Sequence, residues 1–310
     1  MDIFLILFTV IGLSLFEIIT SIDNAIINAE VLTTMSQKAR KFFLFWGILF
    51  AVFIVRGLLP WLIVWITVPG LGPISALTST FSNDPRIAEA IEKASPILLI
   101  GGGTFLLFLF FHWLFIQPKN YGLIGERFFH SQGVWFFAVA SVFLSVIVWL
   151  TINIDPLLAF GAVLGSTAFF ITHGFREHAE KSEINLLNKK NNMSDISKIL
   201  YLEVIDATFS IDGVIGAFAF TFSVPLIFFG NGLGAIALRY LTVRNIDNLK
   251  NYRYLKNGAM YSLLFLGTTM TLEGFGMHIP SWIAPFSTII IVGYFFRKSK
   301  IELNKIIEAK

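Results

Sequence analysis

Apolar segments long enough to cross a lipid bilayer recur along almost the whole chain. One span needs about 20 predominantly apolar residues. Of the 310 residues, 55% are hydrophobic, 34 are Phe, and the mean hydropathy is +0.75. A water-soluble domain of this size could not cover so much apolar surface. The sequence therefore predicts an all-α, polytopic membrane protein in which residues 1–310 form a single transmembrane domain.

We expect about nine transmembrane helices, some of them joined by tight hairpins at "NIDP", "SVP" and "MHIP". In each hairpin a proline is expected to open the second helix. The first N–H groups of a helix have no partner within it, so the missing N–H of proline costs no hydrogen bond there. The first segment lacks a basic start and a small-residue cleavage site, so we expect a retained span and not a signal peptide. The predicted spans are 4–31, 42–67, 96–116, 133–152, 156–173, 199–222, 224–241, 257–275 and 280–297.

The distribution of basic residues predicts the orientation of these spans. Of the 23 Lys and Arg residues, 20 fall in the connectors and tail of one side. Arg86 and Lys93 fall on the other side, and Arg56 lies inside a predicted span. The positive-inside rule makes the crowded side cytoplasmic, which places the N-terminus outside and the C-terminus inside. The expected location is the cell membrane, that is, the inner or plasma membrane.

Two segments of similar sequence carry acids inside predicted spans, although a carboxylate at a membrane helix centre costs about 2.5–3.5 kcal/mol on insertion scales. "FEIITSIDNAIINA" (16–29) aligns without gaps on "IDATFSIDGVIGAF" (205–218). The predicted topology runs the two copies in opposite directions, as in the inverted repeats of many secondary transporters. The sequence therefore predicts an inverted structural repeat, with one copy at about 4–116 and the other at about 199–275. The matched pairs are Glu17 with Asp206, Ser21 with Ser210, and Asp23 with Asp212.

The two acids of each copy are six residues apart. On a straight helix that spacing places them about 120° apart around the axis. They can share one site only if the helix unwinds near Ser21 or Ser210. Otherwise the two acids serve different positions along a pathway.

Carboxylates that face one another in a dry interior must be protonated, paired with a cation, or bound to a metal. Carboxylate, amide and hydroxyl oxygens form a hard ligand set that suits Mn²⁺, Ca²⁺ or Mg²⁺. Protonation of the emptied carboxylates makes proton exchange a hypothesis for coupling. In the structural alternative, Arg56 pairs with an acid as counter-charge or gate, and the site loses that ligand. The expected ligands are Glu17, Asp23, Asn24, Asp206 and Asp212, with Ser21, Ser210, Glu203 and Arg56 as accessory residues.

The remaining polar residues of the predicted spans give weaker signals. Asp155 is expected to cap the helix that follows it, and Glu273 fits a vestibule acid and a solvated one equally well. His112 and His173, near the cytoplasmic ends of their spans, fit an interfacial structural role better than a ligand role. The glycines of "IGGGTF" and "FFGNGLGAIAL" are expected to permit close helix packing. The chain has no Cys, which excludes disulfides and thiolate metal sites.

These motifs resemble the TerC/Alx integral membrane proteins, a family associated with manganese efflux and tellurite resistance, and in particular its branch with an uncharacterised integral membrane domain. The family's first signature, a Glu followed after five residues by Asp-Asn, is similar to Glu17, Asp23 and Asn24. Its later elements are similar to Glu203, Asp206 and Asp212, and then to Asn231, Leu238 and Arg239. Gly213 departs from the pattern, because the main branch usually has Ser there.

The resemblance implies a metal exporter of the wider lysine-exporter superfamily, and it adds Asn231 and Arg239 to the accessory residues. The expected function is a divalent metal cation transporter that exports Mn²⁺ from the cytoplasm. The alternatives are a membrane-protein biogenesis or metal-delivery factor for secreted proteins, and an exporter of small organic solutes. An enzyme is not expected, because no nucleophile accompanies a base or cofactor motif. The expected partners are the lipid bilayer and the metal ion, with no tightly bound cofactor and no nucleic acid.

Overall fold

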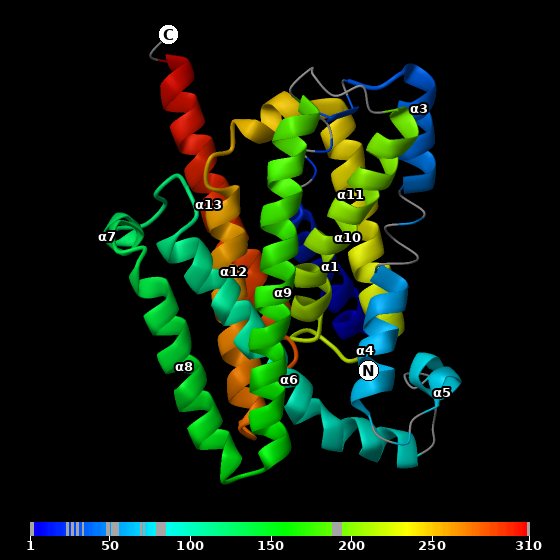
Figure 1. The fold of residues 1–310 in the computed structure, drawn as a ribbon, viewed down its shortest axis with the longest axis vertical. Helices are drawn as coiled ribbons and strands as arrows, with labels where there is room; N and C mark the ends of the chain where they lie inside the picture. The colour runs from blue at the N-terminus through cyan, green and yellow to red at the C-terminus, as the bar shows by residue number, and fades with distance from the viewer. Residues whose placement is uncertain are drawn as a thin grey trace.

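The computed structural model describes residues 3–22, 25, 28, 31–32, 34–47, 50, 56–68, 70, 72–78, 85–187 and 194–308. Every regular element in these ranges is helical, and they contain no strand. Figure 1 shows most of the long helices standing side by side along the long axis of the molecule. The prediction of an all-α fold is therefore confirmed.

Helices long and apolar enough to cross a membrane make up much of this bundle. Five described helices contain such a stretch: α1 (Ile3–Thr20), α6 (Pro85–Phe115), α8 (Trp135–Ile152), α9 (Pro156–Leu187) and α11 (Val224–Lys250). Four further helices pack against them: α4 (Leu59–Thr67), α10 (Asp195–Ala217), α12 (Leu255–Gly274) and α13 (Ile283–Glu308). Each predicted span overlaps one of these nine helices, as expected for a polytopic membrane protein.

The ends of several helices differ from the predicted spans. Helix α6 begins at Pro85 and not at 96, and α11 and α13 run past 241 and 297 to Lys250 and Glu308. The span predicted at 42–67 is not one regular helix, because α3 (Gln37–Phe42) leads into a π-helix, η1 (Phe43–Gly47), and Arg56–Leu58 are also π-helical. Helix α9 continues to Leu187, so much of the charged segment expected to be a connector is helical. Pro156 and Pro225 lie in the first turns of α9 and α11, whereas Pro280 precedes α13 and does not open it.

Two short helices lie outside the bundle, α5 (Pro73–Thr78) and α7 (Glu126–Ser131).

Asp155 behaves as predicted, because its Oδ1 accepts a hydrogen bond of 2.8 Å from the amide of Leu157 in the first turn of α9. Its carboxylate therefore caps the helix that follows it.

Helices α1 and α10 run in opposite directions, as the charge-based topology predicts. In Figure 1, α1 rises toward the end of the molecule that carries α3, and α10 descends from that end. The same end carries the C-terminal part of α13, which is rich in basic residues. The opposite directions of α1 and α10 are those an inverted repeat requires, and the repeat itself stays a prediction.

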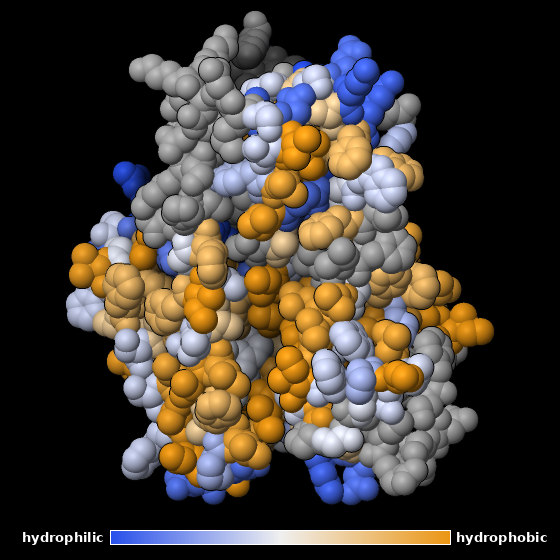
Figure 2. Space-filling model, turned by 45° about the vertical axis from the view of Figure 1, so that its right-hand side comes forward, coloured by the Kyte–Doolittle hydropathy of each residue, from blue (hydrophilic) through white to orange (hydrophobic). Residues whose placement is uncertain are grey.

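The outer surface has the apolar character of a lipid-facing protein. Helix α8 exposes large apolar side chains along its length, including Phe137 at 61%, Val142 at 63% and Trp149 at 73% of their full area. Figure 2 shows hydrophobic residues over much of the middle of one face and hydrophilic residues toward its two ends. Apolar exposure this extensive marks a surface that contacts another apolar phase, which for a bundle of spans is the bilayer.

Close contact between α6 and α9 depends on glycine, as the sequence predicted for "IGGGTF". A Cβ placed on Gly165 of α9 would lie 2.0 Å from the carbonyl oxygen of Gly101 on α6. A Cβ on Gly101 would in turn lie 2.8 Å from the carbonyl oxygen of Gly161. Small residues that let two backbones approach this closely are typical of membrane helix pairs.

Gly165→Ala is expected to lower the free energy of unfolding by about 1–3 kcal/mol, because the new methyl meets rigid backbone and the two helices must separate. The matched control is Gly174→Ala on the same helix, where a Cβ would have no neighbour within 4 Å. Thermal unfolding of both variants in detergent measures the difference. Equal midpoints for the two variants would contradict the proposed backbone contact.

Candidate cation site

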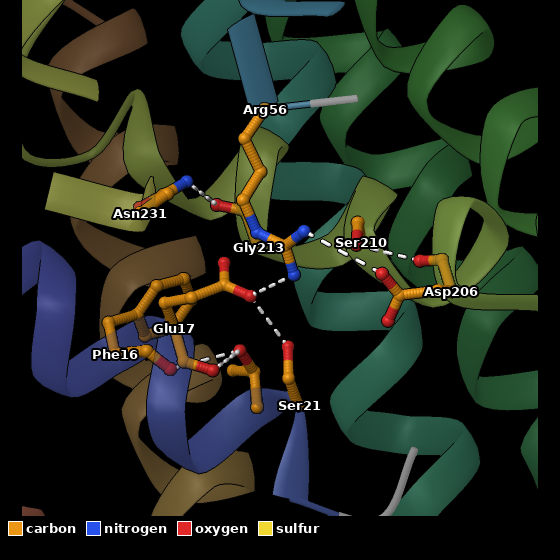
Figure 3. Close-up of polar contacts among 9 residues, drawn as sticks. Phe16, Glu17, Ser21, Arg56, Asp206, Ser210, Gly213 and Asn231 are labelled. Carbon is orange, nitrogen blue, oxygen red and sulfur yellow. Dashed lines mark hydrogen bonds and ion pairs between the residues drawn. The ribbon is translucent and has the colours of Figure 1, made fainter. Parts of the chain in front are cut away.

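The Glu17 carboxylate lies at the end of α1 and is fully buried. Its Oε1 accepts a hydrogen bond of 2.7 Å from the Ser21 hydroxyl and one of 2.5 Å from Nη2 of Arg56 (Figure 3). The Arg56 side chain is only 2% exposed. A buried carboxylate needs such a partner, because an isolated charge in this environment would be costly. The structural alternative for Arg56, a counter-charge to one of the acids, is therefore what the structure contains.

Arg56 also links Glu17 to the second acidic segment. Its Nη1 lies 3.8 Å from Oδ2 of Asp206 on α10, so one guanidinium lies between carboxylates of α1 and α10 (Figure 3). These two acids are the pair that the sequence alignment matched. The structure therefore brings the first positions of the two motifs together around one cation, which is an arginine side chain.

The second acid of α10 has a different partner. Asp212 is 7% exposed, and its Oδ2 accepts a hydrogen bond from Nη2 of Arg176 on α9. Asp206 and Asp212 thus face different arginines. A spacing of about 120° around a straight helix directs the two side chains to different faces, and the separate partners support the expectation that the two acids of one copy serve different positions.

The two acids of one copy could share a site only if the helix unwound near Ser21 or Ser210. Helix α1 ends at Thr20 and the chain bends at Ser21, although the Ser21 amide still donates to the carbonyl of Glu17 over 3.1 Å. Helix α10 is continuous through Ser210, whose hydroxyl donates over 2.7 Å to the carbonyl of Asp206. The amide of Ala25 likewise donates to the carbonyl of Ser21 over 3.0 Å, so Ser21 marks a bend and not an unwound segment, and α10 does not unwind at Ser210. Of the two alternatives left open by the sequence, this arrangement favours acids that serve different positions.

A third group of charges lies beside η1. A Cβ placed on Gly47 would lie 2.2 Å from Oε1 of Glu203 and 2.9 Å from Nη2 of Arg239, so both side chains reach over this glycine. The guanidinium of Arg239 stacks 4.1 Å from the ring centre of Phe43, and its Nη2 donates to the Phe43 carbonyl over 3.3 Å. Glu203 and Arg239, both predicted accessory residues, thus meet at the same turn of η1.

Several buried oxygens near these pairs have no hydrogen-bond partner among the described residues. They are Glu17 Oε2, Glu203 Oε1, Asp212 Oδ1 and Asn231 Oδ1. A Cβ on Gly213 would lie 2.8 Å from Glu17 Oε2, and the Asn231 amide donates weakly to the Gly213 carbonyl over 3.5 Å. Gly213, which departs from the TerC/Alx pattern, has no side chain, and Glu17 Oε2 occupies the space that a side chain there would need (Figure 3).

These acids do not form a preassembled cage. In the part of the chain that the structure describes, no three His, Asp or Glu side chains converge closely enough to hold a metal ion. Asp23 and Asn24, two of the predicted ligands, lie outside the described residues. The four described carboxylates, Glu17, Glu203, Asp206 and Asp212, are interleaved with the guanidinium groups of Arg56, Arg176 and Arg239.

Arg176 is the residue of this region that the sequence analysis missed. It was counted among the basic residues of a connector, yet it is only 6% exposed and pairs with Asp212. A signal was present: Arg176 follows His173 by three residues, so both lie on one face of the same helix. His173 also contacts His112, with the two ring centres 4.0 Å apart.

The sequence model of a family described as protein of unknown function (DUF475) matches residues 22–306 of the chain. No curated protein and no solved structure matches the chain.

Proposed function

Since the chain belongs to the DUF475 family, proteins of unknown function, its activity has to be derived from its own residues, and we propose that it exports a divalent metal cation, Mn²⁺ in the first place. The proposal includes the likeness to the TerC/Alx proteins, whose motifs these acids match. It also includes protons as the counter-ions that would neutralise emptied carboxylates.

One observation carries the proposal: buried oxygen atoms from three helices lack hydrogen-bond donors in the described part of the chain. Glu17 Oε2 comes from α1, Asp212 Oδ1 from α10 and Asn231 Oδ1 from α11. Nearly all buried polar atoms in proteins are satisfied, so orphaned ones call for an ion or water as partner. Carboxylate and amide oxygens are hard donors, which supports Mn²⁺, Mg²⁺ or Ca²⁺ as the cargo.

The arginines fit this function because they supply positive charge to the carboxylates when no metal ion is bound. In this arrangement Arg56 neutralises Glu17 and Arg176 neutralises Asp212, so neither of these two carboxylates is left as an uncompensated charge when no metal is bound. A cation that enters must take over these oxygens while the guanidinium groups move aside. Such an exchange suits a transporter, because a transported ion has to be released as readily as it is bound.

The test uses inside-out vesicles that contain a Mn²⁺ reporter, with wild type beside Asp23→Asn and Asp212→Asn. We expect each substitution to lower the initial rate of uptake about tenfold or more, since even outer-shell changes at metal sites cost 10–100-fold. The matched control is Glu89→Gln, which removes a carboxylate whose side chain is 64% exposed. Undiminished uptake in both Asp variants would refute the metal site.

A second candidate, an exporter of small organic solutes, is supported by the arginines themselves. Buried guanidinium groups beside buried carboxylates offer complementary partners to both charged ends of an amino acid. The same vesicles discriminate between the two proposals when a radiolabelled amino acid mixture replaces Mn²⁺. Co-purification of partner proteins, with no transport of either cargo by reconstituted protein, would instead favour the biogenesis or metal-delivery role.

A further inference from the structure

A cavity of about 410 Å³ lies where the end of α6 meets α9 and the start of α12. Its lining includes His112 near the end of α6, Gln117 just after that helix, His173 and Arg176 from α9, and Lys256 from α12. Three separate helices thus contribute nitrogen-bearing side chains to one hollow. Its volume is in the range of pockets that hold small ligands or ligand head groups.

The polar side chains of this cavity are those that recognise anions. Arg176 is charged at every physiological pH, and Lys256 adds a second positive charge. Each of the two histidines offers a ring N–H, and both do so from the same wall, because their ring centres are 4.0 Å apart. None of the described residues that line the cavity is an Asp or Glu.

The amide of Gln117 adds an adaptable group. Its Oε1 is buried and has no hydrogen-bond partner among the described residues. Because amide oxygen and nitrogen exchange places on a half-turn of the side-chain torsion, the same position can present an N–H₂ donor to an anion. The amide of Gln117 therefore places in the cavity a group that can hydrogen-bond to a polar ligand.

The neighbourhood of the cavity carries additional positive charge. Lys119, in the connection after α6, donates to the carbonyls of Trp113 and Leu114 over 2.5 and 2.6 Å. Burial, the largest cause, lowers the pKa of Lys119 to about 8; Glu126 opposes this shift, and the charge of Lys256 adds to it. Lys256 thus acts on a second lysine, and an anion held beside it would relieve their repulsion.

One acid does contact the lining. Asp212 pairs with Nη2 of Arg176, which also belongs to the candidate cation site. His173 also lies close enough for its charge to act on Asp212. The described lining of the cavity carries basic groups, whereas the cation site combines carboxylates with arginines, and the two sites share Arg176 and adjoin at His173.

We propose that this cavity binds the phosphate group of an anionic ligand. A phosphate presents several strong acceptor oxygens in different directions, which matches donors arriving from three helices better than a carboxylate with two coplanar oxygens does. Basic pockets between membrane helices on the cytoplasmic side bind lipid head groups in this way. The apolar Ile116 and Pro118 beside the cavity are exposed, so the phosphate of a lipid and a soluble phosphate can both reach it.

The test measures phosphate binding to the full-length protein in neutral detergent, with two probes that separate the sources. Inorganic phosphate, titrated by calorimetry, represents the soluble source. Phosphatidylglycerol in mixed micelles, detected as retained lipid by native mass spectrometry, represents the lipid source, with phosphatidylcholine as the uncharged comparison. We expect wild type to bind at least one phosphate probe, and retention of phosphatidylglycerol without binding of inorganic phosphate would assign the site to lipid.

Lys256→Gln and His173→Gln are expected to weaken that binding about tenfold each, since both remove a charge-assisted or directed hydrogen bond to phosphate. Lys38→Gln is the matched control, because it removes an exposed lysine of α3, far along the chain from the cavity. Size-exclusion profiles establish that each variant remains folded. The proposal is overturned if wild type binds neither phosphate probe, or if both cavity variants bind as tightly as the Lys38 variant does.

Discussion

Arg56→Gln is expected to lower the free energy of unfolding by about 3–5 kcal/mol, the usual cost of removing one partner of a buried ion pair. The Glu17 carboxylate is fully buried and receives its only charged hydrogen bond among the described residues from Nη2 of Arg56. After the substitution, Ser21 alone would donate to that carboxylate, and Asp206 would lose the same neighbouring charge. Unfolding of the purified protein in mixed detergent micelles measures the loss.

Two controls separate this loss from a general effect of removing an arginine. Arg127→Gln removes an exposed arginine beside the bundle and is expected to change stability by less than about 0.5 kcal/mol. Glu17→Gln combined with Arg56→Gln removes both charges of the closer pair, so the part of the loss that comes from Glu17 should be recovered, while Asp206 still lacks its neighbouring charge. If the single Arg56 variant unfolds no more easily than the Arg127 variant, the ion pair does not stabilise the fold.

The spans could be predicted because hydropathy can be read from a short stretch of sequence. A helix that crosses a bilayer must be apolar over the whole stretch, so this property alone identifies it. Trp135–Ile152 and Pro156 both lie where their apolar runs placed them, within a few residues. The helix ends were less predictable. Helix α9 runs on to Leu187 because charged residues remain good helix formers once a helix emerges from the membrane, so charge marks the interface and not the helix end.

The candidate site was predictable only in part, for a physical reason. Matching two acidic motifs could pair Glu17 with Asp206, because both positions belong to segments of the same pattern. It could not show that an arginine stands between them, since contacts across helices depend on packing. Arg176 illustrates the limit: its position among basic residues indicated a connector, and only the packing of α9 against α10 directs it to Asp212.

Asp212→Asn is expected to lower the free energy of unfolding by about 3–5 kcal/mol, because it leaves the Arg176 guanidinium buried without its carboxylate. The double variant, Asp212→Asn with Arg176→Gln, removes both charges and is expected to regain most of that stability. Unfolding of the single and double variants in detergent micelles measures both changes. A single variant as stable as wild type would contradict the pairing.

The same double variant decides whether Asp212 only stabilises the fold or also holds the cargo. If the carboxylate serves the ion pair alone, restoring stability also restores Mn²⁺ uptake in vesicles. If Oδ1, which has no described hydrogen-bond partner, is a ligand, the stable double variant still transports about tenfold more slowly or worse. For the proposed cation site to stand, the double variant must therefore regain stability without regaining transport. Removal of Arg176 restores the balance of buried charge, but it cannot replace a lost metal ligand.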